Sequence, residues 1–208
     1  MKKFLVCLLL FAAVFLLGGC FSFRSLSLEG KELQFETVDL DGGPVRSDEL
    51  FARHELTLLN LWATWCGPCI SELHDLNTVN EKLAAMDCGV VGLLNENEPD
   101  VALAKRYLSE KGADYPVILA PENMMELIRQ SYFPMTVFVN REGMIVGNPI
   151  LGAPGKNAVE FYLNAVEKVL EKTGKDEQKK KERFQALFCS STWIRTGNLT
   201  VNSRSLCR

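Results

Sequence analysis

A mostly apolar stretch that leads into two cysteines is the feature that most constrains this 208-residue chain. The run from Leu56 to Trp62 has the length and composition of a strand buried on both faces. A helix-compatible stretch from about Ile70 to Met86 follows it, and Cys66 and Cys69 lie at the junction between the two. The cysteines are therefore expected at a helix N-terminus.

This position favours redox chemistry at the first cysteine. Unpaired backbone N–H groups and the helix dipole stabilise a thiolate at a helix N-terminus, so Cys66 is the expected nucleophile. Cys69 lies one turn further along, where it can attack a mixed disulfide formed on Cys66 and act as the resolving thiol. Pro68 suits a first helical turn, and Gly67 allows a substrate backbone to approach closely. The motif predicts a redox-active disulfide that needs no other cofactor.

A structural disulfide or half of a zinc site is the alternative interpretation of such a pair. A zinc site needs further ligands at suitable spacing, and the sequence has no second Cys-x-x-Cys pair and only two histidines, His54 and His74. We therefore predict no metal site. The acidic turn from Glu96 to Asp100 lacks the spaced ligands and central glycine of a calcium loop, and Cys88 is expected to be a small buried side chain.

The segment Leu59-Asn60-Leu61-Trp62-Ala63-Thr64-Trp65-Cys66-Gly67-Pro68-Cys69 resembles the thioredoxin superfamily, and most closely its membrane-anchored TlpA/ResA-like branch. Asp39 to Gly43, Gly112 to Ala120 and Phe133 to Val139 follow in the order of that branch, so the resemblance covers about residues 33 to 172. It implies an α/β, thioredoxin-like fold with a central mixed sheet flanked by helices. The implied activity is thiol-disulfide exchange with protein thiols and disulfides.

The order of the expected elements agrees with this fold class. Phe35 to Leu40 and the turn at Asp41-Gly42-Gly43-Pro44 indicate a short N-terminal β-hairpin extension, and helices and strands alternate after Trp62. A closing amphipathic helix has Tyr162 among its apolar positions. We expect these later elements at Ser71 to Met86, Val90 to Leu94, Asp100 to Lys111, Pro116 to Leu119, Asn123 to Tyr132, Met135 to Val139, Met144 to Val146 and Lys156 to Lys172.

The N-terminus has the features of an export signal. Lys2 and Lys3 precede an apolar run from Phe4 to Leu17, as in secretory signals. Leu17-Gly18-Gly19-Cys20 resembles a bacterial lipobox, in which cleavage leaves a lipidated Cys20, and an uncleaved transmembrane helix is the alternative. Either anchor leaves the domain outside the cytoplasm. We expect a signal peptide over 1–19, an anchor and tether over 20–33, the thioredoxin-like domain over 34–172 and a charged, disordered tail over 173–208.

Export also bears on the partners of this chain. Outside the cytoplasm no glutathione or thioredoxin pool keeps thiols reduced, so we expect a membrane electron donor of the thiol-reducing type. The net charge of −3 argues against a nucleic-acid surface. About 140 residues between anchor and tail suffice for one domain with its own core, and we expect a monomer.

The resemblance implies a substrate groove beside the motif. Pro134 matches the proline that is cis in this family and lies against the Cys-x-x-Cys loop, whereas an ordinary trans proline is the alternative. A cis peptide turns the backbone sharply and frees polar groups to pair with an extended substrate. Phe133 and Pro134 are therefore expected to line the groove together with Trp65, Gly67 and Pro68.

A proton acceptor for the resolving thiol is less apparent from the sequence. Asn60 stands where thioredoxins carry a buried acid, and an amide cannot accept a proton. Glu72, three residues after Cys69, is the candidate for proton transfer, although a first-turn Glu can simply compensate the helix dipole.

Two other functions occur on this fold. A thiol peroxidase would need Pro and Thr or Ser at the positions of Leu59 and Ala63, and a copper chaperone would need a later histidine, but none follows His74. Gly67-Pro68 matches thioredoxin itself, which is among the more reducing couples, so we predict an extracytoplasmic reductase of protein disulfides.

Overall fold

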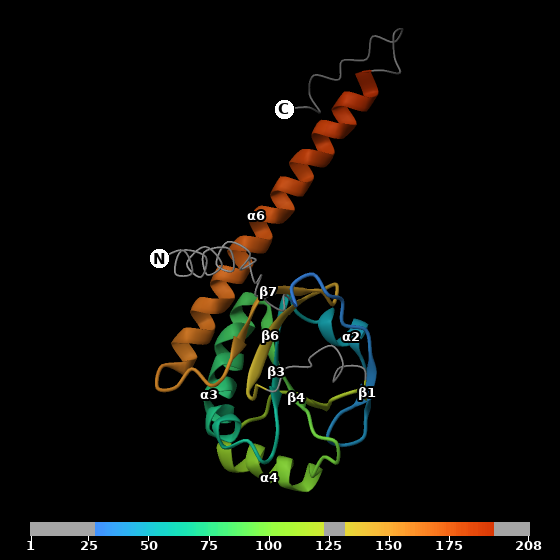
Figure 1. Cartoon of the computed structure of the whole chain (residues 1–208). Coiled ribbons are helices and arrows are strands. Elements are labelled where there is room, and N and C mark those ends of the chain that lie inside the picture. Colours follow the sequence, from blue (N-terminus) through green and yellow to red (C-terminus); the bar gives the residue numbers. More distant parts are fainter. Residues whose placement is uncertain (1–27, 123–131, 194–208) are drawn as a thin grey trace, which may run out of the picture.

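The computed structural model describes residues 28–122 and 132–193, and a five-stranded mixed sheet lies at its centre (Figure 1). The strands are ordered β5-β4-β3-β6-β7, with β3 parallel to β4 and antiparallel to β6. The α/β arrangement of a mixed sheet flanked by helices is confirmed. In chain order the elements are β1 (Glu36–Val38), β2 (Pro44–Arg46), α2 (Ser47–Phe51), β3 (Leu56–Trp62), α3 (Gly67–Leu83), η1 (Ala84–Met86), β4 (Cys88–Leu94), α4 (Val101–Lys111), β5 (Val117–Leu119), β6 (Met135–Asn140), β7 (Ile145–Leu151) and α6 (Ala158–Trp193).

The central strand β3 is buried along its whole length, as predicted. Leu58 and Trp62 belong to the hydrophobic cluster on one face of the sheet, whereas Leu59 and Leu61 belong to the cluster on the other face. Because successive side chains of a strand point to opposite faces, burial on both sides favours apolar residues at nearly every position. The two polar residues of β3, Thr57 and Asn60, are buried as well. The chain leaves β3 at Trp62 and enters α3 only a few residues later, which places the two cysteines at this end of the sheet.

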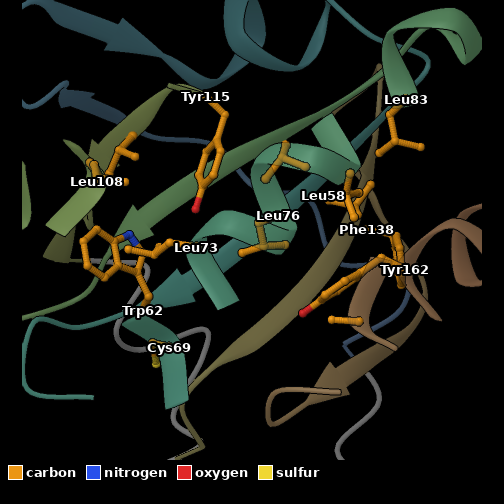
Figure 2. Packing of buried hydrophobic residues seen from close by; sticks show 14 of the residues in the cluster. Leu58, Trp62, Cys69, Leu73, Leu76, Leu83, Leu108, Tyr115, Phe138 and Tyr162 are labelled. Carbon is orange, nitrogen blue, oxygen red and sulfur yellow. The ribbon is translucent and has the colours of Figure 1, made fainter. Parts of the chain in front are cut away.

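Different elements cover the two faces of the sheet. Helices α3 and α6 pack against each other on the first face, where Tyr162 and Val166 of α6 join the cluster around α3 (Figure 2). The N-terminal segment and α2 cover the other face through Leu33, Leu50 and Phe51. The helix predicted from Asn123 to Tyr132 lies almost entirely outside the described residues.

The predicted N-terminal hairpin is present as the two-stranded antiparallel sheet β1-β2. Asp39 organises its turn, because one carboxylate oxygen accepts hydrogen bonds from the backbone N–H groups of Asp41 and Gly43, both at 2.8 Å. A Cβ atom at Gly43 would lie 2.8 Å from that carboxylate, so a larger residue here would displace the Asp39 side chain from the turn. The Thr37 hydroxyl donates to the carbonyl of Leu119 at 2.8 Å, which places the hairpin beside the edge strand β5.

Two features of the fold differ from the sequence-based prediction, the length of β7 and the presence of α2. Strand β7 runs from Ile145 to Leu151 rather than ending at Val146, although it contains Pro149. A proline is tolerated here because β7 is an edge strand, where one side of the backbone has no strand to pair with. The short helix α2 was not expected from the sequence and follows β2 directly.

Helix α6 is longer than predicted. Its first half packs on the domain through Tyr162, Val166 and Val169, and Figure 1 shows the second half projecting away from the body of the domain. We expected a disordered tail from residue 173, but the backbone is helical to Trp193. The Lys, Glu and Gln residues that follow 175 are good helix formers, which accounts for the difference. Residues 194–208 of the predicted tail lie outside the described part of the chain.

The predicted export signal and anchor, including Cys20, precede the first described residue. Within 28–122 and 132–193, none of the helices has the length and hydropathy needed to cross a bilayer.

Candidate active site

The two motif cysteines lie at the start of α3 and are joined by a disulfide. Cys66 is the N-cap residue, and its Sγ accepts a hydrogen bond from the backbone N–H of Cys69 at 3.3 Å. Helix α3 thus begins at Gly67, inside the motif, rather than at about Ile70. The earlier helix start has a local cause. Pro68 has no backbone N–H, so its place in the first turn leaves no N–H group of its own unpaired.

The cysteines differ in their access to solvent. Cys66 keeps 5% of its surface exposed, whereas Cys69 is fully buried. Figure 2 shows Cys69 at one end of the buried cluster, with Leu73 further along α3. A sulfur that approaches from outside therefore reaches Cys66 first, as expected for a nucleophile followed by a resolving thiol.

Aromatic side chains form a rim beside the disulfide. Trp65 is 69% exposed, and its ring meets the ring of Phe133 edge-on, with centroids 5.2 Å apart. The Phe133-Pro134 peptide is cis, and the Pro134 carbonyl accepts a hydrogen bond from Gly152 N–H at 2.8 Å. The structure thus brings the proline loop against the motif loop. Leu151, which pairs with Met135 in the sheet, is also exposed at this end.

An acidic residue that the sequence did not single out contacts the motif loop. The carboxylate of Glu96 accepts a hydrogen bond from the backbone N–H of Thr64, two residues before Cys66. Glu96 follows β4, which pairs in parallel with β3 so that Trp62 faces Leu94. The sequence indicated only that the turn at 96–100 is not a calcium loop, and it assigned Glu96 no role. Glu96 can hold the motif loop because β4 pairs with β3 in this register, and the register cannot be read from the sequence.

Glu72 is buried on α3 within a ring of four polar side chains. Asn60 Nδ2 donates to Glu72 Oε1 and to Thr136 Oγ1, each at 3.0 Å. The Tyr162 hydroxyl donates to Glu72 Oε2 at 3.2 Å and lies 3.3 Å from Thr136 Oγ1. All four side chains are at most 3% exposed. The buried acid absent at position 60 is therefore replaced by an acid bonded to that same residue.

Burial raises the pKa of Glu72 to about 7, which brings its titration into the neutral range. The hydrogen bonds from Asn60 and Tyr162 lower that pKa but do not offset the desolvation, and the charge of Asp75 raises it further. A carboxyl group with such a pKa can accept and return a proton near neutral pH. Sequence reasoning found Glu72 but missed Thr136 and Tyr162, since Tyr162 looked like one more apolar position of the closing helix.

Comparison with known families shows which family the chain belongs to. Residues 27–150 match the Redoxin family. The chain belongs to that family. Among curated relatives, the thiol-disulfide oxidoreductase ResA of Bacillus thuringiensis is 26% identical over 150 residues, covering 71% of this chain and 84% of the relative. The thiol:disulfide interchange protein DsbE of Haemophilus influenzae is 33% identical over 132 residues, covering 58% of this chain and 70% of the relative.

This redoxin-family protein is thus a TlpA/ResA-like thiol-disulfide oxidoreductase of the thioredoxin superfamily. Its fold resembles that of a thioredoxin-family thiol:disulfide interchange protein from Chlorobium tepidum, with a TM-score of 0.56 and 24% identity, covering 68% of this chain and 97% of that one. A DsbF homologue from Corynebacterium diphtheriae gives a TM-score of 0.55 at 19% identity, covering 71% and 97%. Across the described ranges, no cluster of His, Cys, Asp and Glu is arranged to hold a metal ion.

Proposed function

We propose that this oxidoreductase reduces disulfides of exported proteins, with Cys66 as the nucleophile and Cys69 as the resolving thiol. The observation that carries the proposal is the unequal exposure of the pair at the N-terminus of α3, where Cys66 reaches the surface and Cys69 does not. Protein substrates agree with the rim formed by the exposed Trp65 and Leu151 and the half-buried Phe133, because a mixed disulfide needs a surface that holds the substrate chain.

The reaction starts from the dithiol form. The Cys66 thiolate attacks one sulfur of the substrate disulfide, a mixed disulfide forms, and the other substrate sulfur leaves as a thiolate that takes a proton from solvent. Cys69 then loses its proton and attacks Cys66 Sγ, which forms the Cys66–Cys69 disulfide and releases the second substrate thiol. Two electrons pass to the substrate. We assign the acceptance of the Cys69 proton to Glu72, whose pKa of about 7 suits a base near neutral pH.

Two features of the motif bear on the direction of electron flow through their effect on the Cys66 thiolate. The helix N-terminus stabilises the thiolate and so makes the couple more oxidising, but Gly67-Pro68 adds no basic side chain to extend that effect. We therefore expect only a moderate stabilisation of the Cys66 thiolate and a reduction potential of roughly −220 to −280 mV, on the reducing side of known couples.

The proposed location is outside the cytoplasm, on the membrane. The export signal in residues 1–19 supports it, with attachment through a lipid on Cys20 or through an uncleaved transmembrane helix. A membrane donor of the thiol-reducing type would return the disulfide to the dithiol, because no cytoplasmic thiol pool is available there.

Insulin reduction by the full chain tests the activity. With dithiothreitol as electron source, Cys66→Ser should abolish catalysis, since no mixed disulfide can form. Cys88→Ala is the matched control: Cys88 is buried and free, so its loss should leave the rate unchanged. Full activity in Cys66→Ser would refute the assignment of the nucleophile. Equilibration with glutathione gives the potential, and a value near that of a strong periplasmic oxidant, about −120 mV, would contradict the reductase direction.

A further inference from the structure

The polar ring around Glu72 is closed, and each of its members comes from a different element. Asn60 lies on β3, Glu72 on α3, Thr136 on β6 and Tyr162 on α6. Since hydroxyl groups both donate and accept, whereas the Asn60 amide nitrogen only donates, the two hydroxyls are the members that can reverse direction.

The geometry requires such a reversal when Glu72 changes its charge. As a carboxylate, Glu72 accepts from Asn60 Nδ2 at 3.0 Å and from the Tyr162 hydroxyl at 3.2 Å. Once protonated on Oε2, it must donate, and Tyr162 Oη is the acceptor within reach. The hydrogen of Tyr162 can then turn to Thr136 Oγ1, which lies 3.3 Å away.

We propose that Tyr162 and Thr136 form a hydroxyl relay that keeps two hydrogen bonds on the Glu72 carboxyl group in both of its charge states. When a proton arrives on Oε2, Tyr162 turns from donor to acceptor, and the proton is not passed on to Thr136 or Asn60 before Glu72 returns it. Tyr162 is thus a positioning residue that acts through Glu72. Its place in catalysis rests on the proposed function, in which Glu72 takes the Cys69 proton.

The surroundings of the ring agree with this assignment. Burial and the nearby charge of Glu72 raise the pKa of Tyr162 far above its usual value, so Tyr162 turns without ionising. Besides burial, the charge of Asp75 on α3 raises the pKa of Glu72, and burial and the charge of Glu72 in turn raise the pKa of Tyr115, which precedes β5. Within the described residues the Tyr115 hydroxyl is buried without a hydrogen-bond partner, and Figure 2 shows it entering the cluster from a different direction than Tyr162.

Tyr115 therefore supplies a matched control. Tyr162→Phe and Tyr115→Phe each remove one buried hydroxyl, but only Tyr162→Phe removes a donor to Glu72. The carboxyl carbon of Glu72 is titrated by ¹³C NMR in the oxidised full chain, and its signal is identified by its absence in Glu72→Gln. Loss of the donor should raise the Glu72 pKa by about one unit. Tyr115→Phe should leave it in place.

The pH profile of insulin reduction gives a second readout, which a merely structural role would not shift. The pH at which the rate of insulin reduction rises should be higher in Tyr162→Phe, by about as much as the Glu72 pKa. If Tyr162→Phe does not fold, Thr136→Val and Thr136→Ser take its place. Thr136→Val should raise the Glu72 pKa, whereas Thr136→Ser, which keeps the hydroxyl, should leave it at the wild-type value.

The outcomes separate the relay from the function. An unchanged Glu72 pKa in Tyr162→Phe, or an equal shift in Tyr115→Phe, overturns the relay whatever the activity. A shifted pKa in a protein whose wild type reduces no disulfide supports the relay and refutes the proposed function. A shifted pKa with an unmoved pH profile in an active enzyme overturns the link between the relay and the proton of Cys69.

Discussion

Among the acidic side chains that the structure describes, Glu72 is the one that lies buried in the core. A carboxyl group with 3% exposure would normally be excluded from the core, because desolvation disfavours its charged form. Here Asn60 and Tyr162 each donate a hydrogen bond to it, which makes both charge states accessible. Where thioredoxins carry a buried acid on β3, this chain has the hydrogen-bond donor Asn60, and the buried acid is Glu72 on α3.

The raised pKa of Glu72 has a consequence for stability. The native pKa of about 7 exceeds the ordinary 4.5, so between these values the native state binds more protons than the unfolded state. This contribution to stability is complete below pH 4.5 and is lost as pH rises through 7, by about 3 kcal/mol at most. Glu72→Gln should lack this pH dependence in urea unfolding of the oxidised protein at pH 5 and 8.5. Glu160→Gln, at an exposed position of α6, is the control, and equal pH dependence in all three proteins would contradict the prediction.

Among the elements, the junction of β3 and α3 sets the geometry of the disulfide. Its loop is held from two sides, by Glu96 after β4 and by the ring contact of Phe133 with Trp65 before β6. The N-cap position of Cys66 follows from the start of α3 at Gly67. The reactive sulfur is therefore positioned by a helix end and by two neighbouring strands together.

Removal of the Glu96 side chain tests the support from β4. Thr64 is 8% exposed, so Glu96→Ala leaves its N–H unpaired in a largely buried position. We expect a loss of about 1–3 kcal/mol in the free energy of unfolding. Glu98→Ala, at an exposed position of the same turn, should change stability by less than about 0.5 kcal/mol. Chemical denaturation of the oxidised proteins measures both, and similar losses for the two variants would show that Glu96 has no special contact.

For the chain as a whole, the N-terminal segment and the disulfide lie at opposite ends of the sheet. The segment joins β7 near its start, where Gly30 N–H donates to the Ile145 carbonyl at 2.8 Å, and Lys172 of α6 reaches Glu29 at 2.5 Å. Leu56, at the start of β3, pairs with Asn140 and so lies at the same end of the sheet as the N-terminal segment. The disulfide follows Trp62, at the opposite end of β3. An N-terminal anchor would therefore join the domain at the end of the sheet remote from the disulfide.

The lipid anchor can be tested together with this arrangement. In the exported full chain, Cys20→Ala should abolish labelling by radioactive fatty acid, because its thiol is the proposed acceptor. The same variant should reduce insulin at the wild-type rate, since the anchor joins the domain far from the disulfide. Undiminished labelling would disprove lipidation of Cys20, and a large loss of activity would contradict the separation of the two ends.

Local patterns were sufficient for much of this structure. The apolar run of β3, the Asp39 turn and the start of a helix at the cysteine motif depend on neighbours in the sequence, and so do the caps of α4, where Asp100 accepts from Leu103 N–H and Gly112 ends the helix with φ +61°. Steric limits and short-range hydrogen bonds act within a few residues, so they are readable in one chain. The resemblance to the thioredoxin superfamily added the cis Pro134 and its place beside the motif.

Contacts between distant segments were decided only by the tertiary structure. Tyr162 was expected to be an apolar position, and its hydroxyl gained a function because α6 packs across α3 and β6 at the height of Glu72 and Thr136. Glu96 meets Thr64 because β4 pairs with β3 in one particular register. Strand register and helix packing depend on the balance of many weak contacts over the whole core, and no single stretch of sequence records that balance.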